Sequence, residues 1–215
     1  MFGGTTYERQ IHDWLVSWES LGYYRFWCKQ EHPENSRVVA VVMLNPGSLN
    51  ANGEGLSRDT TLRVLREIFI GTSYNPFVIN LFNFAAPKPA EFFKAWEHRD
   101  HPAFKFAKLQ KDEFSAVMYA YGDYENGGNY HLEIKQRIAE IRCFMSEVPE
   151  INVPKNMSGT PKHPLPVQQQ GLKETFRQAI ITHASSHHTL KRDCADKAHV
   201  ALSSTLYSGI EGRRD

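Results

Sequence analysis

The feature that most constrains the fold is an unbroken apolar run at residues 38–44, Val-Val-Ala-Val-Val-Met-Leu, followed directly by Asn45-Pro46-Gly47. A strand that is apolar at every position must be covered on both faces, which is typical of a central parallel strand. The Asn-Pro-Gly sequence is a turn signal that ends such a strand. We therefore expect an α/β fold with residues 38–44 at its centre.

Apolar runs alternate with helix-like segments along the chain, which predicts three α/β/α layers around a mostly parallel, four-stranded sheet. The predicted core strands lie at residues 38–44, 77–84, 116–121 and 141–146. The predicted helices are one that begins near Asp59 and three more at about 89–113, 130–140 and 171–182. We also expect an amphipathic N-terminal helix over 7–21, from the helical spacing of its aromatic residues, and an extra edge strand over 23–29.

At 215 residues and 41% hydrophobic, the chain can bury one sizeable core. We expect a single domain over residues 1–182 and a polar, His-rich, flexible tail over 183–215. The segment 147–162 is rich in Pro, Asn and Ser and predicts a long loop, which is more often functional than idle.

Charge and cysteine usage limit the partners. The formal net charge is only +1, so any DNA contact would need a local basic face. Cys28, Cys143 and Cys194 are widely separated and fit neither a disulfide framework nor a metal knuckle. No apolar run approaches the roughly 20 residues needed to cross a bilayer. We expect a cytoplasmic monomer without cofactor, metal or membrane contact.

Polar motifs follow the predicted strands, at the edge where ligands bind in open α/β sheets. The motifs are Asn45-Pro46-Gly47, Asn80-Leu81-Phe82-Asn83-Phe84, Tyr121-Gly122-Asp123 and His163-Pro164. Turn chemistry alone explains an Asn-Pro-Gly sequence about as well as function does. The position that the motifs share is what predicts a ligand site.

This order of motifs resembles the uracil-DNA glycosylase superfamily. Asn45-Pro46-Gly47 matches the first motif of its mismatch-specific branch, and Asn80 is similar to the asparagine that reads the pyrimidine edge. Residues 117–122 resemble the third strand of that family, and residues 163–166 resemble its His-Pro motif. The resemblance implies a DNA glycosylase that hydrolyses the N-glycosidic bond of a flipped pyrimidine and leaves an abasic site.

The chain is also similar to domain of unknown function family 1643. The matching residues are Asn45-Pro46-Gly47-Ser48, Asp59-Thr60-Thr61, Asn80-Leu81-Phe82 and His163-Pro164-Leu165. Together the two resemblances span roughly residues 20–170.

The resemblance assigns catalysis to Asn45, Asp59 and His163. The Asn45 carbonyl could hold the attacking water, although an amide is not a strong base. Asp59 either assists or only caps the next helix. His163 donates a hydrogen bond to the departing base, unless it is an exposed loop histidine.

The expected base-binding residues are Gly47, Asn80, Phe82 and Phe84. Asn80 offers a donor and an acceptor to the base, while either phenylalanine could stack on the base or belong to the core. Gly47 would leave room for a large C5 substituent, so we expect a modified pyrimidine, such as one in phage DNA, rather than plain uracil.

The expected DNA contacts come from Ser48, Lys155, Lys162 and Leu165, with Leu165 as a wedge in the base stack. Two alternatives stay open. One is a hydrolase or transferase that acts on free nucleotides or nucleosides, and the other is a non-catalytic module that binds modified bases.

Overall fold

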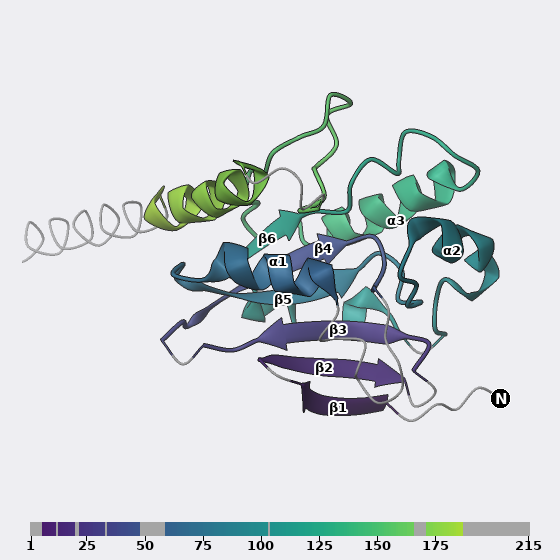
Figure 1. The fold of residues 1–215 in the computed structure, drawn as a ribbon, viewed down its shortest axis with the longest axis horizontal. Coiled ribbons are helices and arrows are strands. Elements are labelled where there is room, and N and C mark those ends of the chain that lie inside the picture. The colour runs from purple at the N-terminus through teal and green to yellow at the C-terminus, as the bar shows by residue number, and fades with distance from the viewer. Residues whose placement is uncertain are drawn as a thin grey trace, which may run out of the picture. The chain divides into compact units, whose positions relative to one another are not determined.

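The computed structural model describes residues 6–11, 13–19, 22–32, 34–47, 59–102, 104–165 and 171–186 (Figure 1). Its contacts divide the chain into two units, Met1–Ile180 and Ile181–Asp215. The fold below is that of the first unit. All described residues of the second unit, 181–186, are helical.

The first unit is built on one six-stranded mixed sheet, in the order β1-β2-β3-β5-β4-β6. The strands are β1 (Thr6–Ile11), β2 (Trp14–Glu19), β3 (Arg25–Gln30), β4 (Arg37–Met43), β5 (Tyr74–Asn80) and β6 (Ala116–Tyr119). Pairing is antiparallel from β1 through β3 to β5, and parallel only between β5, β4 and β6. The expectation of three layers around a mostly parallel, four-stranded sheet is therefore wrong. Residues 38–43 do belong to a parallel strand, β4, but it lies between β5 and the edge strand β6 and not at the centre of the sheet.

Helices cover both faces of the parallel part (Figure 1). They are α1 (Thr60–Phe69), α2 (Pro89–Lys94) and α3 (His131–Phe144). Ile134, Ile138 and Ile141 of α3 pack with Val42 and other residues of the sheet in one core. We call this side the α3 face, and the side that α1 covers the α1 face. Residues 171–182 are helical as expected, and Lys173 pairs with Glu67 of α1.

The expected N-terminal helix over 7–21 is instead the antiparallel hairpin β1–β2. Trp14, Val16 and Trp18 alternate along β2 and are all buried, whereas Tyr7 on β1 is half exposed. The same aromatic residues therefore satisfy a period of two as well as the helical spacing. Pairing with β3 gives β2 a buried face, which decides between the two patterns.

The strand expected over 23–29 is confirmed as β3, but it is not an edge strand. It lies inside the sheet and pairs with β2 on one side and β5 on the other. β3 also contains a β-bulge, because Trp18 of β2 faces Arg25 while Ser17 faces Trp27, leaving Phe26 as the extra residue.

The strand expected at 141–146 does not form, because α3 continues to Phe144. The neighbour of β6 is instead the segment after α3, where Glu150 forms a parallel bridge with Val117. The long helix expected over 89–113 is also wrong. Among the residues described in that stretch, only α2 and three single turns are helical, Trp96–His98, Phe106–Lys108 and Lys111–Glu113, and Pro102 lies between them.

Candidate active site

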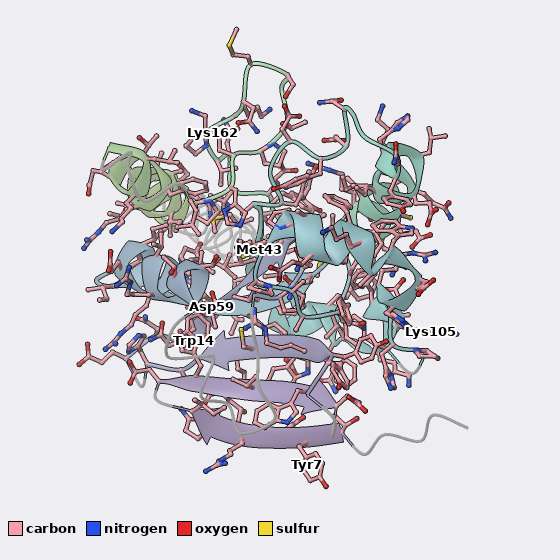
Figure 2. The ribbon with its side chains drawn as sticks, turned by 45° about the vertical axis from the view of Figure 1, so that its right-hand side comes forward. Tyr7, Trp14, Met43, Asp59, Lys105 and Lys162 are labelled. Atoms are coloured by element: carbon pink, nitrogen blue, oxygen red, sulfur yellow. The ribbon has the colours of Figure 1, made fainter. Side chains whose placement is uncertain are left out.

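Asp59 is the centre of a polar cluster at the carboxyl ends of the parallel strands, at the start of α1 (Figure 2). Its Oδ1 accepts hydrogen bonds from the amides of Thr61 and Leu62, at 3.0 and 3.1 Å, so it is the N-cap of α1. Its Oδ2 lies 3.0 Å from a guanidinium nitrogen of Arg25, and both side chains are almost fully buried. Capping and charge pairing thus occupy both oxygens.

Arg25 was not among the residues that the sequence predicted for the site. The bulge at Phe26 places it on the α1 face together with Cys28, although residues three apart in a regular strand would point to opposite faces. Arg25 is 2% exposed, and its buried Nε has no hydrogen-bond partner in the described part of the chain. A charged residue within the apolar run Tyr23–Cys28 was the available sequence signal.

Cys28 lies beside this pair but is not a reactive thiol. Burial raises its pKa to about 12. The charge of Arg25 lowers this pKa and the charge of Asp59 raises it, each by less than burial does. The thiolate is the nucleophilic form of cysteine, so Cys28 serves the packing of the α1 face.

The Asn45-Pro46-Gly47 turn is held against the segment that follows β5. The Asn45 side chain donates from Nδ2 to the carbonyls of Pro46, at 2.8 Å, and Ala86, at 3.2 Å. The amide of Ala86 donates back to the Pro46 carbonyl at 3.0 Å. Both donors of the Asn45 amide are therefore used, which leaves Oδ1 as an oriented acceptor that could hold a water molecule.

Gly47 lies against Asp59. A Cβ atom built on Gly47 would come within 2.8 Å of Asp59 Oδ2, a distance that real Cβ atoms essentially never show. Glycine is therefore needed here for the close approach of a carboxylate. The room that we expected for a C5 substituent of the base is filled by Asp59.

Asn80 ends β5 on the α1 face, opposite Met43 in the register of β4. On the other side of β5, Ile79 pairs with Trp27 of β3, so Asn80 lies next to the bulge of β3. Its side chain is 2% exposed, and neither Oδ1 nor Nδ2 has a partner among the residues described. Such a buried, unsatisfied amide costs stability, roughly 1–3 kcal/mol for each polar group, unless a ligand or water completes it.

His163 is held as a neutral, oriented donor. Its Nδ1 accepts a hydrogen bond from the amide of Leu165 at 3.1 Å, so the proton of the neutral ring lies on Nε2. Burial lowers its pKa to about 4, and the nearby charge of Asp59 opposes this only in part. A Cβ atom built on Gly122 would lie 3.6 Å from the Cβ of His163, and Gly122 has a φ of +84°.

His163 opens onto a pocket of about 420 Å³. The other residues that line it are Gly122, Asp123, Tyr124, Asn156, Lys162, Leu165 and Leu172. Two of the expected DNA contacts, Lys162 and Leu165, thus line this pocket, while Lys155 is exposed on the preceding hairpin.

Two expected site residues lie elsewhere. Phe82 is 1% exposed and packs with Phe92 and Trp96 on the α3 face, so it belongs to the core. Phe84 is half-buried and makes an edge contact with Tyr24, 5.7 Å between ring centres. Ser48 lies outside the described residues. Within the described segments, no group of three His, Cys, Asp or Glu side chains could hold a metal ion.

One stretch of family similarity contains the whole polar cluster. The members of the cluster are Arg25, Asn45, Asp59, Asn80 and His163. The model of a family described as "Protein of unknown function (DUF1643)" matches residues 24–165, about two thirds of the chain. The chain belongs to this family. The DUF1643 match begins just before β3, so the β1–β2 hairpin lies outside it.

Other comparisons add no relative. Neither a curated protein nor a solved structure matches the DUF1643 chain. None of the helices in its described segments is both long and apolar enough to cross a membrane.

Proposed function

We propose that this DUF1643 protein is a DNA glycosylase, which hydrolyses the N-glycosidic bond of a flipped pyrimidine and leaves an abasic site. The observation that carries the proposal is the Asn80 side chain, which is buried on the α1 face and whose donor and acceptor have no partner among the residues that the structure describes. An adjacent donor and acceptor match the hydrogen-bonding edge of a pyrimidine ring.

The remaining cluster supplies the other requirements of this reaction. Bond cleavage develops negative charge on the leaving base and positive charge on the sugar, while water attacks the sugar. The neutral His163 ring can donate from Nε2 to an oxygen of the leaving base. Asn45 Nδ2 makes both hydrogen bonds of this side chain in the described residues, which leaves Oδ1 as the acceptor that can orient the water. Asp59 holds Arg25 and the start of α1 in place, and thus acts as a positioning residue.

The order of the motifs supports the same proposal, because the resemblance to the uracil-DNA glycosylase superfamily rests on Asn45, Asn80 and His163. We place the enzyme in the cytoplasm, on the basis of its widely separated cysteines. Since Asp59 fills the space beside Gly47, a C5-modified base is one substrate among several to be tested.

The test is incubation with DNA that carries uracil, mismatched thymine or C5-substituted pyrimidines, followed by alkaline cleavage at abasic sites. We expect cleavage with at least one of these bases and none with Asn80→Leu. Asn80→Leu should also raise the urea midpoint of unfolding, because it keeps the side-chain volume and removes two buried atoms that have no partner in the described part of the chain. Loss of activity with a gain in stability cannot come from misfolding.

Asn83→Leu is the matched control. Asn83 is as buried as Asn80, but its Oδ1 accepts a hydrogen bond from the His101 backbone amide at 2.7 Å. Asn83→Leu removes this hydrogen bond and should therefore lower the urea midpoint. Full activity of Asn80→Leu would refute the role of Asn80, and the absence of abasic sites on every substrate would refute the glycosylase.

A second candidate is a hydrolase that acts on free nucleosides. The net charge of +1 favours it, because a small substrate needs no basic surface. Release of free base from nucleosides, with no cleavage of DNA, would select this function.

A further inference from the structure

The loop between β6 and α3 contains an Asn-Gly pair that is open to solvent. Asn126 and Gly127 are both exposed and belong to no helix or strand. Gly127 has no positive φ, and a Cβ atom built on it would meet nothing within 4 Å. Among the described residues, the Gly127 amide has no hydrogen-bond acceptor. Its nitrogen is therefore free to approach the side chain of Asn126.

The Asn126 side chain shares an acceptor with a hairpin beside the candidate site. Asn126 Nδ2 donates to Asp123 Oδ1 at 2.9 Å, and the Thr160 hydroxyl donates to the same oxygen at 3.1 Å. Thr160 is 5% exposed and lies in the hairpin over residues 155–161, which leads to His163. Asp123 also lines the pocket of His163. One carboxylate oxygen thus joins the loop, the hairpin and the pocket.

The hairpin depends on this attachment because its tip is exposed. Residues 157–159 are all exposed, and the hairpin rises clear of the sheet and helices in Figure 1. The Asn156 amide donates to the Thr160 carbonyl at 2.8 Å, and the Gly159 amide donates to the Asn156 carbonyl at 3.0 Å. These two bonds lie within the hairpin, whereas the bond from Thr160 to Asp123 crosses to the segment that follows β6.

We propose that Asn126 is a site of spontaneous deamidation, and that the product releases the hairpin from Asp123. The Gly127 nitrogen loses its proton to hydroxide and attacks Cγ of Asn126, and glycine has no Cβ to obstruct this approach. The new N–Cγ bond closes a succinimide ring, while the Cγ–Nδ2 bond breaks and Nδ2 leaves as ammonia with a proton from water. Water then adds to one of the two ring carbonyls and opens the ring to aspartate or isoaspartate.

Deamidation replaces a hydrogen-bond donor by a negative charge. An ionised carboxylate has no hydrogen to donate, so the bond to Asp123 is lost and two like charges face each other. The hydrogen bond from Asn126 is the largest of the effects that lower the pKa of Asp123, so its main stabilisation is lost as well. Repulsion should separate the loop from the hairpin and break the contact of Asp123 with Thr160.

The test ages the purified full chain at mildly alkaline pH and maps its peptides by mass spectrometry. We expect the Asn126 peptide to gain the mass that conversion of an amide to an acid adds, at a rate that rises with hydroxide concentration. Asn152 is the internal control, because it is also exposed but precedes valine, whose branched side chain obstructs the attack. Gly127→Ala should slow the conversion of Asn126 to the rate of Asn152, and open space accommodates the alanine.

Release of the hairpin is measured as trypsin cleavage after the exposed Lys155, before and after ageing. Aged wild type and fresh Asn126→Asp should be cut faster than fresh wild type, while Gly127→Ala should be cut at the same rate before and after ageing. A second Asn-Gly pair, Asn52-Gly53, is intact in Gly127→Ala, so its conversion cannot produce this difference.

Two results would overturn this proposal. If Asn126 converts no faster than Asn152, Asn126 is not a deamidation site. If fresh Asn126→Asp is cut at the wild-type rate, the product does not release the hairpin. Both measurements are independent of the proposed glycosylase, since neither uses DNA or an activity assay.

Discussion

Replacing Asp59 by alanine should destabilise the fold strongly, because Asp59 has two separate structural roles. It caps α1 through two backbone amides, and losing such a cap costs about 1 kcal/mol. It also neutralises Arg25, which is 2% exposed, and removing one partner of a buried ion pair costs about 3–5 kcal/mol. The sum of about 4–6 kcal/mol compares with a total stability of about 5–15 kcal/mol for a typical domain.

Two further variants separate these contributions in urea unfolding followed by circular dichroism. Asp59→Asn keeps a good N-cap and removes only the charge, so it should lose about 3–5 kcal/mol. Arg25→Met combined with Asp59→Asn leaves no unpaired charge and should recover most of that loss. The reasoning is refuted if Asp59→Asn alone lies within about 1 kcal/mol of the wild type.

Three other predictions concern single residues near the cluster. Since burial lowers the pKa of His163 from 6.5 to about 4, the unfolded chain binds more protons between these values, and stability should fall by roughly 1–3 kcal/mol as pH drops through this window. Urea midpoints at several pH values check this, and His163→Gln should remove the dependence. Gly122→Ala should cost more stability than Gly128→Ala, although both have positive φ, because only at Gly122 would the new Cβ meet a ring, at 3.1 Å. Equal urea midpoints for the two variants would contradict this. Cys28, with a pKa of about 12, should stay unmodified by iodoacetamide in the native protein while the exposed Cys143 reacts, as mass spectrometry can show.

The elements best predicted from the sequence were those whose pattern allows one interpretation. The continuous apolar run at 38–44 fits a strand that is covered on both faces of the sheet, and β4 is such a strand. Asp59 followed by Leu62 and Leu65 predicts a capped amphipathic helix, and α1 begins there. The helix expected over 171–182 forms as well.

The elements that were wrong carry patterns that fit two structures. Residues 141–146 contain apolar positions that suit a short strand, but Ile141 also continues the spacing of Ile134 and Ile138. Local hydrogen bonds favour continuing the existing helix over starting a strand. Over 7–21, the choice between helix and hairpin depended on β3 as a partner, which lies outside that window.

Some of the residues expected at the site lie at one end of the sheet. Asn45, Asp59 and His163 follow turn or cap motifs, and the structure places them near the same end of the sheet, as expected from the shared position of strand ends. Phe82 belongs to the core, one of the two roles expected for it, and it lies on the α3 face because a residue just beyond a strand end no longer follows the alternation of that strand. The alternation of side chains along a regular strand could not predict that Arg25 lies at the site, because the bulge in β3 determines to which face the Arg25 side chain points.

The bulge in β3 also determines which length changes the chain can tolerate. Side chains alternate with a period of two, so deleting Phe26 would restore a regular strand and turn either Arg25 or Cys28 to the other face. An insertion in the exposed loop around Met157 carries no such penalty for the sheet. Homologous chains should therefore vary in length near the hairpin, while the number of residues between Arg25 and Cys28 stays the same.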